Sequence, residues 1–230
     1  MIKNLLFCIV LMNIIQTWKT NEIPGHYKPF IESVFKYTKN WNYMFFNDNE
    51  IERFIDEKMP EYRTTFDNLT YKIQKIDFFR YLAVYYYGGV YLDLDILLHT
   101  DLDGIIENPE MCKFPVEIDT IKDTVITRHD FHSLIGNYAF YAPAKHPFLK
   151  QIIDNICNSR MSEEDILLAQ STNGDSIKEV YVYCTTGPLM VTQSYIDYEN
   201  KSDVELLRPS PYRANFFGDY GRHCSYGSWK

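Results

Sequence analysis

The sequence predicts an α/β protein with a mostly parallel central sheet flanked by helices. The chain has 230 residues, of which 46% are hydrophobic and 23% are charged, so it is large enough for one domain with a sizeable core. Strand-like and helix-like segments alternate along its first half, which is typical of parallel strands joined by crossover helices. We therefore expect one domain over residues 1–230.

The first half of the chain is expected to run strand, helix, strand, helix. Pro29 falls in the first turn of the first helix, where proline is tolerated, and Asp48 is a good N-cap for the second. Apolar residues of the first helix share one face, which we expect to point inward: Phe30, Val34 and Phe35. The four expected elements are residues 9–18, 26–39, 41–46 and 47–58.

Residues 74–95, QKIDFFRYLAVYYYGGVYLDLD, are the segment around which the chain is organised. Its first part predicts a helix, because apolar residues recur at intervals of three to four: Ile76, Phe79, Ala83 and Tyr87. Gly88 and Gly89 end this helix, since glycine readily adopts the conformation of a helix C-cap. A strand is expected next, over residues 90–96.

Asp93 and Asp95 are candidate metal ligands on that strand. Side chains alternate along a strand, so we expect both carboxylates on one face, about 7 Å apart along the strand. Such a pair at the rim of an α/β sheet is suited to a divalent cation, and oxygen ligands favour Mn²⁺ or Mg²⁺. The alternative is an acidic strand end without a metal, because a D-x-D pair also arises by chance.

Asp77 and Arg80 lie three residues apart on the preceding helix and share a face. They form either a surface salt bridge, which stabilises little, or a functional pair. The second reading is favoured by the surroundings of Arg80, because a single charge within a mostly apolar helix requires a partner.

Seven residues of this region resemble the D-x-x-R-Y…GG-x-Y-x-D-x-D block of glycosyltransferase family 32: Asp77, Arg80, Gly88, Gly89, Tyr91, Asp93 and Asp95. The spacing is also similar to that in the glucosyltransferase domains of large clostridial toxins. The resemblance implies a glycosyltransferase A-type fold, a nucleotide-sugar donor (a GDP- or UDP-hexose), Mn²⁺ or Mg²⁺, and transfer with retention of anomeric configuration. It implies catalytic roles for Asp93, Asp95, Arg80 and Asp77.

Segments elsewhere extend the resemblance. NIIQTWKT is similar to the opening motif of the family, which implies that Trp18 stacks on the nucleotide base, and NYAFYA and TTGP resemble two further elements. The C-terminal GRHCSYGSW resembles the end of the family's catalytic domain and implies that His223 is a third metal ligand. The implied donor-binding residues are Trp18, Gln16, Asp77, Arg80, Tyr91, Asn137, Thr186, Gly187, Ser228 and Trp229.

Several of these assignments have plainer alternatives. Trp18 is equally compatible with a core position, the T-T-G-P segment with an ordinary helix start, and His223 with a surface site. The alternative functions are a metal-dependent hydrolase or phosphotransferase acting on a nucleotide-sugar, and a relative that binds the donor without transferring it. The acceptor is left open among glycan, lipid and protein.

The remainder of the chain is less regular. Asp101 and Asp103 repeat the D-x-D pattern, but Asp103 precedes a glycine in a turn signal, so we do not expect them in the site. Residues 107–135 show no clear periodicity and are expected to form loops with short strands. We expect strands at 137–142, 179–184 and 204–207 and helices at 146–158, 163–169 and 189–198.

Composition restricts partners and location. The net charge of −8 argues against nucleic acid as a partner. The five cysteines are scattered without a C-x-x-C pair, which argues against a zinc cluster or a disulfide scaffold. Residues 1–12 are either a signal-like or anchor extension, which would place the protein in a secretory lumen, or part of the approach to the first strand of a cytoplasmic protein. Membrane association is left open by the sequence.

Overall fold

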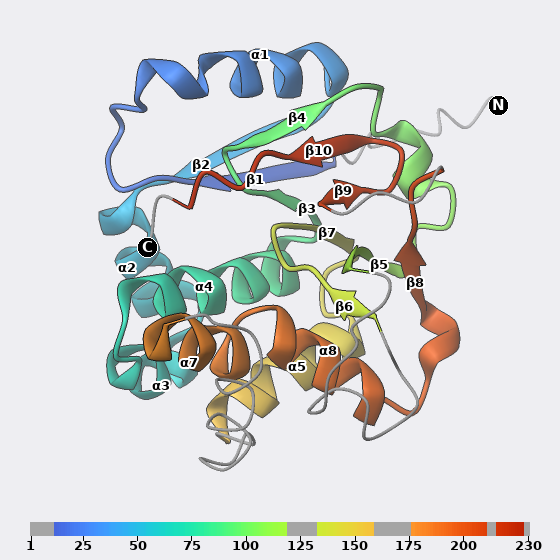
Figure 1. Cartoon of the computed structure of the whole chain (residues 1–230). Coiled ribbons are helices and arrows are strands. Elements are labelled where there is room, and N and C mark those ends of the chain that lie inside the picture. The colour runs from blue at the N-terminus through green and yellow to red at the C-terminus, as the bar shows by residue number, and fades with distance from the viewer. Residues whose placement is uncertain (1–11, 119–132, 159–175, 211–214, 228–230) are drawn as a thin grey trace, which may run out of the picture.

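The computed structural model describes residues 12–118, 133–158, 176–210 and 215–227 (Figure 1). At its centre is a seven-stranded sheet in the order β2-β1-β3-β7-β5-β6, with β8 paired to β5. Its strands are β1 (Asn13–Thr17), β2 (Asn42–Phe46), β3 (Gly89–Leu92), β5 (Cys112–Ile118), β6 (Leu134–Ile135), β7 (Ala139–Ala142) and β8 (Val204–Leu207).

Strand direction brings four strand ends to one edge of this sheet. β1 is parallel to β2 and β3, and β7 is antiparallel to both β3 and β5, so β3 and β5 point the same way. The C-terminal ends of β1, β2, β3 and β5 therefore share an edge. The predicted α/β class is confirmed, with parallel pairing in β2-β1-β3 and between β5 and β8, and antiparallel pairing around β7.

Helices and a second sheet cover the two faces of the large sheet. In Figure 1, α1 and the small sheet β4-β10-β9 lie on one side, and α4, α5, α7 and α8 lie on the other. The helices are α1 (Lys28–Tyr37), α2 (Asp48–Lys58), α3 (Arg63–Asn68), α4 (Lys72–Tyr87), α5 (Pro147–Cys157), α7 (Ile177–Thr185) and α8 (Pro188–Asp197). The strands of the small sheet are β4 (Ile96–Leu98), β9 (Phe216–Phe217) and β10 (Gly221–His223).

Alternation along the central strands builds a core on each face. Ile15 and Tyr91 pack into the cluster that contains the buried side chains of α2, α4 and α5, whereas Ile14 and Val90 pack into the cluster that contains Val34 of α1. These residues are at most 1% exposed. The expected inward face of α1 is right for Val34 and for Phe30, which joins a third cluster, but Phe35 is 53% exposed.

The predicted end of α4 is confirmed at Gly88, whose φ is 67°. Gly89 follows with a φ of 113°, and a Cβ built there would overlap the carbonyl oxygen of Asn13. Two glycines are therefore needed here, because the chain turns sharply out of α4 and β3 then approaches β1 closely.

The expected strand over residues 90–96 is wrong in one respect that matters for the site. β3 ends at Leu92, and β4 begins at Ile96 in the other sheet. Asp93 and Asp95 lie in the turn between them, where the backbone N–H of Ile96 donates to the carbonyl of Asp93 at 3.1 Å. The two carboxylates are therefore arranged by a turn that joins two sheets and not by the alternation of one strand.

Two further expectations are corrected. Residues 179–184 were expected to form a strand but are helical within α7, whose N-terminus has a capping box formed by Ser176 and Glu179. The N-cap of α2 is Asn47, and Asp48 is its first residue. The strands β5 and β6 lie within 107–135, where loops with short strands were expected.

Some expectations fall on residues that the structure does not describe. The helix expected at 163–169 lies outside the described residues, and so does nearly all of the signal-like segment at 1–12. Among the helices that are described, none combines the length and the apolar character needed to cross a membrane.

Candidate functional site

A cavity of about 550 Å³ opens at the sheet edge where the strand ends meet. Its walls include Trp18 after β1, Asp48 after β2, Asp93 after β3 and Glu117 near the end of β5. Ligand-binding cavities in proteins have volumes of about 300–1,000 Å³. The cavity therefore has the size and the position of a small-molecule site in an α/β protein.

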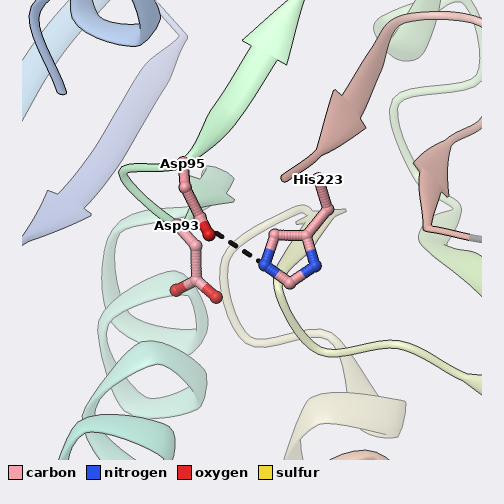
Figure 2. A group of neighbouring side chains, drawn as sticks. All are labelled: Asp93, Asp95 and His223. Atoms are coloured by element: carbon pink, nitrogen blue, oxygen red, sulfur yellow. Dashed lines mark ion pairs between the residues drawn. The ribbon is translucent and has the colours of Figure 1, made fainter. Parts of the chain in front are cut away.

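Asp93, Asp95 and His223 form a cluster of candidate metal ligands in this cavity (Figure 2). One ligand atom from each residue lies within 4.8 Å of the other two. The side chains of Asp95 and His223 point toward each other, with 3.3 Å between Oδ1 and Nε2, and the Asp93 carboxylate lies beside them. His223 is the last residue of β10, so the small sheet delivers the third member of the cluster.

Backbone contacts fix the turn that carries the two aspartates. The N–H of Asp93 donates to the carbonyl of Tyr138 at 2.7 Å, and the N–H of Cys224 donates to the carbonyl of Asp95 at 3.0 Å. The N–H of Tyr226 donates to the Asp95 carboxylate at 2.8 Å. The turn is thus held between the start of β7 and the segment after β10, which limits the freedom of both carboxylates.

The charges of the cluster perturb one another. Burial raises the pKa of Asp93, an effect that Arg80 offsets and the Asp95 charge reinforces. Burial also acts to raise the pKa of Asp95, but the hydrogen bond and charge of His223 outweigh it, so this pKa is lowered. For His223, burial acts to lower the pKa, and the contacts with Asp95 and then Asp93 outweigh it, so this pKa is raised.

The donor set fits a divalent cation. Ligand atoms bonded to one ion at about 2.0–2.6 Å lie up to about 5 Å from each other, which matches the spacing of this cluster. Two carboxylates and one imidazole suit Mn²⁺ or Mg²⁺ better than a metal that prefers thiolates. A bound cation would also relieve the repulsion between the two carboxylates. The structure therefore brings together the three residues predicted as metal ligands.

The raised pKa values of Asp93 and His223 predict how metal binding depends on pH. Metal binds deprotonated carboxylates and neutral imidazole, so protons compete with it more strongly when those pKa values are raised. Affinity should therefore fall as the pH falls, and we expect the Kd for Mn²⁺ at pH 6 to be at least about tenfold higher than at pH 8. Isothermal titration calorimetry at the two pH values measures this, and equal Kd values would contradict it.

Arg80 and Asp77 form a buried network beside the cluster. Each is 3% exposed, and Arg80 Nη2 lies 3.1 Å from the Asp77 carboxylate and 3.4 Å from that of Asp93. Arg80 also lies over the ring of Tyr91, with 4.6 Å to the centroid. The reading of Asp77 and Arg80 as a surface salt bridge is therefore wrong, and Arg80 holds Asp93 in place.

Asp77 also forms hydrogen bonds with polar residues at the ends of two other elements. Its carboxylate accepts hydrogen bonds from Asn137 Nδ2 at 3.2 Å and from the Thr186 hydroxyl at 2.9 Å. Burial raises the pKa of Asp77 to about 6, although Arg80 and Thr186 act to lower it. The network links α4, the start of β7 and the end of α7, so it fixes one wall of the cavity.

The predicted donor-binding residues divide into three groups. Those that line the cavity are Trp18, Asp77, Arg80, Asn137 and Gly187. Those that the structure does not bring to the cavity wall are Gln16, Tyr91 and Thr186, all at most 1% exposed. Ser228 and Trp229 lie outside the described residues.

The residues set back from the cavity support it from behind. The Gln16 amide donates to the carbonyls of Leu92 and Asp93 at 3.3 and 3.4 Å, and the Tyr91 hydroxyl donates to the Asp93 carboxylate at 2.8 Å. Thr186 holds Asp77. Gln16, Tyr91 and Thr186 therefore position residues of the site, and contact with a donor stays a prediction for them.

The structure adds cavity residues that the sequence did not single out. Tyr138 stacks on His223 with 4.4 Å between ring centroids, and Glu117 lines the wall at the end of β5. Lys19, Lys72 and Lys178 also line the cavity. Tyr138 could have been predicted from the sequence, because it directly follows Asn137, a predicted donor-binding residue. Glu117 could not, because the segment around it shows no periodicity.

Asp101 and Asp103, the second D-x-D pair, lie away from the cavity. Asp101 is exposed, and Asp103 accepts a hydrogen bond from the Trp41 indole at 3.0 Å. Neither residue lines the cavity or joins the cluster of candidate ligands.

The comparison with known proteins finds a family match that includes the segment from Asp77 to Asp95. Residues 24–112 match the family described as "Glycosyltransferase sugar-binding region containing DXD motif". Inositol phosphoceramide mannosyltransferase 3 of Schizosaccharomyces pombe is 32% identical over 61% of this chain and 35% of its own length. Inositol phosphoceramide mannosyltransferase 1 of the same organism is 29% identical over 80% of this chain and 50% of its own. The chain thus spans half or less of the length of these two relatives.

Solved structures that are similar to the chain include the PaToxG glycosyltransferase, with a TM-score of 0.48, 15% identity, and coverage of 84% of this chain and 71% of that one. The resemblance carried by the Asp77–Asp95 block is confirmed by the family match, which contains that block. Residues 24–112 of the chain are therefore similar to the sugar-binding region of glycosyltransferases that contain a DXD motif.

Proposed function

We propose that the chain transfers a hexose from a nucleotide-sugar donor to a hydroxyl group of an acceptor, with a divalent cation held by Asp93, Asp95 and His223. The observation that carries the proposal is the convergence of these three ligands, within 4.8 Å of one another, in a cavity at the carboxyl edge of the sheet. The match to a DXD-containing sugar-binding region supports it.

Different residues of the site would have different roles in this reaction. The cation, when bound, would neutralise charge on the departing nucleoside diphosphate as a Lewis acid, which is worth several kcal/mol in general. Arg80 orients Asp93 and favours its ionised form, and the backbone N–H of Tyr226 does the same for Asp95. Asp77 and Asn137 lie on the same wall and offer a carboxylate and an amide to the hydroxyls of the donor sugar.

The names of the relatives support a choice of donor and acceptor. The relatives named above are inositol phosphoceramide mannosyltransferases. Another relative is the initiation-specific α-1,6-mannosyltransferase of Candida albicans, which is 23% identical over 82% of this chain and 53% of its own length. We therefore propose mannose, carried by GDP, as the sugar and a glycolipid or glycan hydroxyl as the acceptor. Retention of configuration is part of the proposal, and a front-face reaction is the simplest route to it.

The proposal is tested with a panel of nucleotide-sugars in the presence of Mn²⁺. We expect GDP-mannose to raise the melting temperature, because a ligand at about 100 times its Kd adds about 2.7 kcal/mol to the free energy of unfolding. GDP should then be released with formation of a mannoside. Release of phosphate without a glycoside would favour a hydrolase or phosphotransferase, and binding without turnover would favour an inactive relative.

Trp18 provides a direct test of the donor-binding mode. Its ring lines the cavity 5.0 Å from that of Tyr27, and the Lys19 ammonium lies 5.5 Å from its centroid. We expect GDP with Mn²⁺ to quench part of the tryptophan fluorescence, and Trp18→Ala to abolish that quench. Nucleotide affinity should fall about tenfold in the variant, because base–aromatic stacking contributes about 1–3 kcal/mol.

Trp41 is the matched control for this measurement. It hydrogen-bonds to Asp103 and does not line the cavity, so Trp41→Phe should leave the nucleotide-dependent quench in place. An unaltered quench together with an unaltered nucleotide affinity in Trp18→Ala would show that Trp18 is a structural residue and that the base binds elsewhere.

A further inference from the structure

Glu117 is an acidic residue in the wall of the cavity, and it belongs neither to the proposed metal ligands nor to the proposed donor-binding residues. It lies near the end of β5, whose C-terminal end shares an edge with those of β1, β2 and β3. Asp93 follows β3. In the strand order, β1 and β2, which precede Trp18 and Asp48, lie on one side of β3, and β7 and then β5 lie on the other. The cavity therefore extends past the metal ligands, away from the end at which Trp18 would hold the base.

The side chain of Glu117 is directed by an irregularity in its strand. Val116 pairs with Ile135 and Ile118 pairs with Leu134, so one residue of β5 is left between two consecutive partners on β6. Glu117 is that extra residue. Such bulges change the direction of a side chain and are common beside active sites. Here the bulge places a carboxylate in the wall of the cavity.

Two contacts place Glu117 next to the third metal ligand. The N–H of Asn215 donates to the carbonyl of Glu117 at 3.3 Å, and the N–H of His223 donates to the carbonyl of Asn215 at 2.8 Å. Asn215 thereby joins the end of β5 to the end of β10. The negative charge of Glu117 also contributes to the raised pKa of His223. The cluster of candidate metal ligands consists of Asp93, Asp95 and His223 and does not include Glu117.

The position of Glu117 is costly to the folded state. Burial raises the pKa of its carboxyl, with the positive charge of His223 acting against this and the negative charge of Asp93 adding to it. The hydrogen bonds and ion pairs found among the described residues include none to its carboxylate. A partly buried carboxylate without such partners lowers stability, so it is expected where a ligand supplies the partner.

We propose that Glu117 binds the acceptor: its carboxylate accepts a hydrogen bond from the hydroxyl that attacks the donor sugar, and so orients that hydroxyl. This rests on the proposed function and adds the acceptor side of the same site. Asp77 and Asn137 are the residues proposed to contact the donor sugar. Glu117 is on β5, which lies on the side of Asp93 away from Trp18 in the strand order. Because a carboxylate attracts hydroxyls and repels anions, the reacting part of the acceptor is a neutral polyol or sugar, and any acceptor phosphate binds farther away.

The test uses Glu117→Gln in the full chain, with GDP-mannose as donor and with methyl α-mannoside, myo-inositol or water as acceptor. We expect the turnover number for GDP release to fall at least about tenfold, because the attacking hydroxyl is less well oriented. The Kd values for Mn²⁺ and GDP should stay within twofold of those of the unaltered protein. Glu117→Asp should recover part of the turnover, and Glu110→Gln, an exposed control shortly before β5, should change none of these values.

The melting temperature separates this role from a structural one. Removing a partly buried charge without a partner should leave the melting temperature of Glu117→Gln unchanged or higher. A lower melting temperature with a parallel loss of turnover would overturn the proposal in favour of a structural role. Weakened Mn²⁺ binding would overturn it in favour of a metal ligand, and undiminished turnover would overturn it outright. If the unaltered protein releases no GDP, the proposed function itself fails.

Discussion

Replacing Asp95 by Asn is expected to lower Mn²⁺-dependent release of GDP from GDP-mannose by a factor of about one hundred or more. The substitution keeps the shape of the side chain but removes a charge that contributes to cation binding, and each tenfold loss of rate corresponds to about 1.4 kcal/mol. An amide oxygen still accepts the hydrogen bond from the Tyr226 N–H, so the turn should persist. Release of GDP is measured at saturating donor over a range of Mn²⁺ concentrations, with the melting temperature as the control for folding.

Asp93→Asn should have a similar effect on rate, and His223→Ala a smaller one, because a neutral imidazole attracts a hard cation less than a carboxylate does. Asp101→Asn is the matched control. Asp101 has the same chemistry and lies eight or fewer residues from both ligands, yet it is exposed and outside the cavity. Full Mn²⁺-dependent activity in folded Asp93→Asn and Asp95→Asn would show that the metal site is elsewhere.

The site residues close to one another in sequence were the ones most accessible to prediction. Asp77, Arg80, Asp93 and Asp95 lie within one helix and the turn after the next strand, so residue type and spacing were enough to identify them. The arrangement of Asp93 and Asp95 in space could not be predicted from residue type and spacing. The chain leaves one sheet for another between Asp93 and Asp95, and alternation along a single strand carries no information about such a crossing.

Elements determined by tertiary contacts were harder to predict. The segment EVYVYC is rich in β-branched and aromatic residues, yet it is helical in α7, which begins at a capping box and packs against α8. Short strands were expected within 107–135 but were not placed, and Pro115 argues against a strand at the position that β5 occupies. His223 was found only through the resemblance of the C-terminal segment, because the small sheet that brings it to the turn is formed by distant segments.

Arg80 is expected to contribute more to stability than any surface ion pair of the chain. Its side chain is 4% exposed, and its guanidinium contacts two carboxylates, the carbonyl of Asn137 at 2.7 Å, and the ring of Tyr91. Replacing Arg80 by Met keeps much of the apolar volume but leaves Asp77 buried without its cationic partner. Loss of one partner of a buried ion pair costs about 3–5 kcal/mol, and we expect a loss of this size in the free energy of unfolding.

Urea denaturation without added metal measures this loss without a contribution from cation binding. Arg53→Met is the control, because Arg53 pairs with Glu50 at 3.9 Å with 64% of its side chain exposed, and its removal should cost less than about 1 kcal/mol. Adding Asp77→Asn to Arg80→Met should recover part of the stability, since the uncompensated charge is then removed as well. The double variant should still release no GDP at a useful rate, because Asp93 has lost the group that orients it.

A loss of less than about 1 kcal/mol in the free energy of unfolding of Arg80→Met would contradict this expectation. It would mean that Asp77 is neutral in the folded protein, and that the buried pair is a hydrogen bond between an acid and a guanidinium rather than an ion pair.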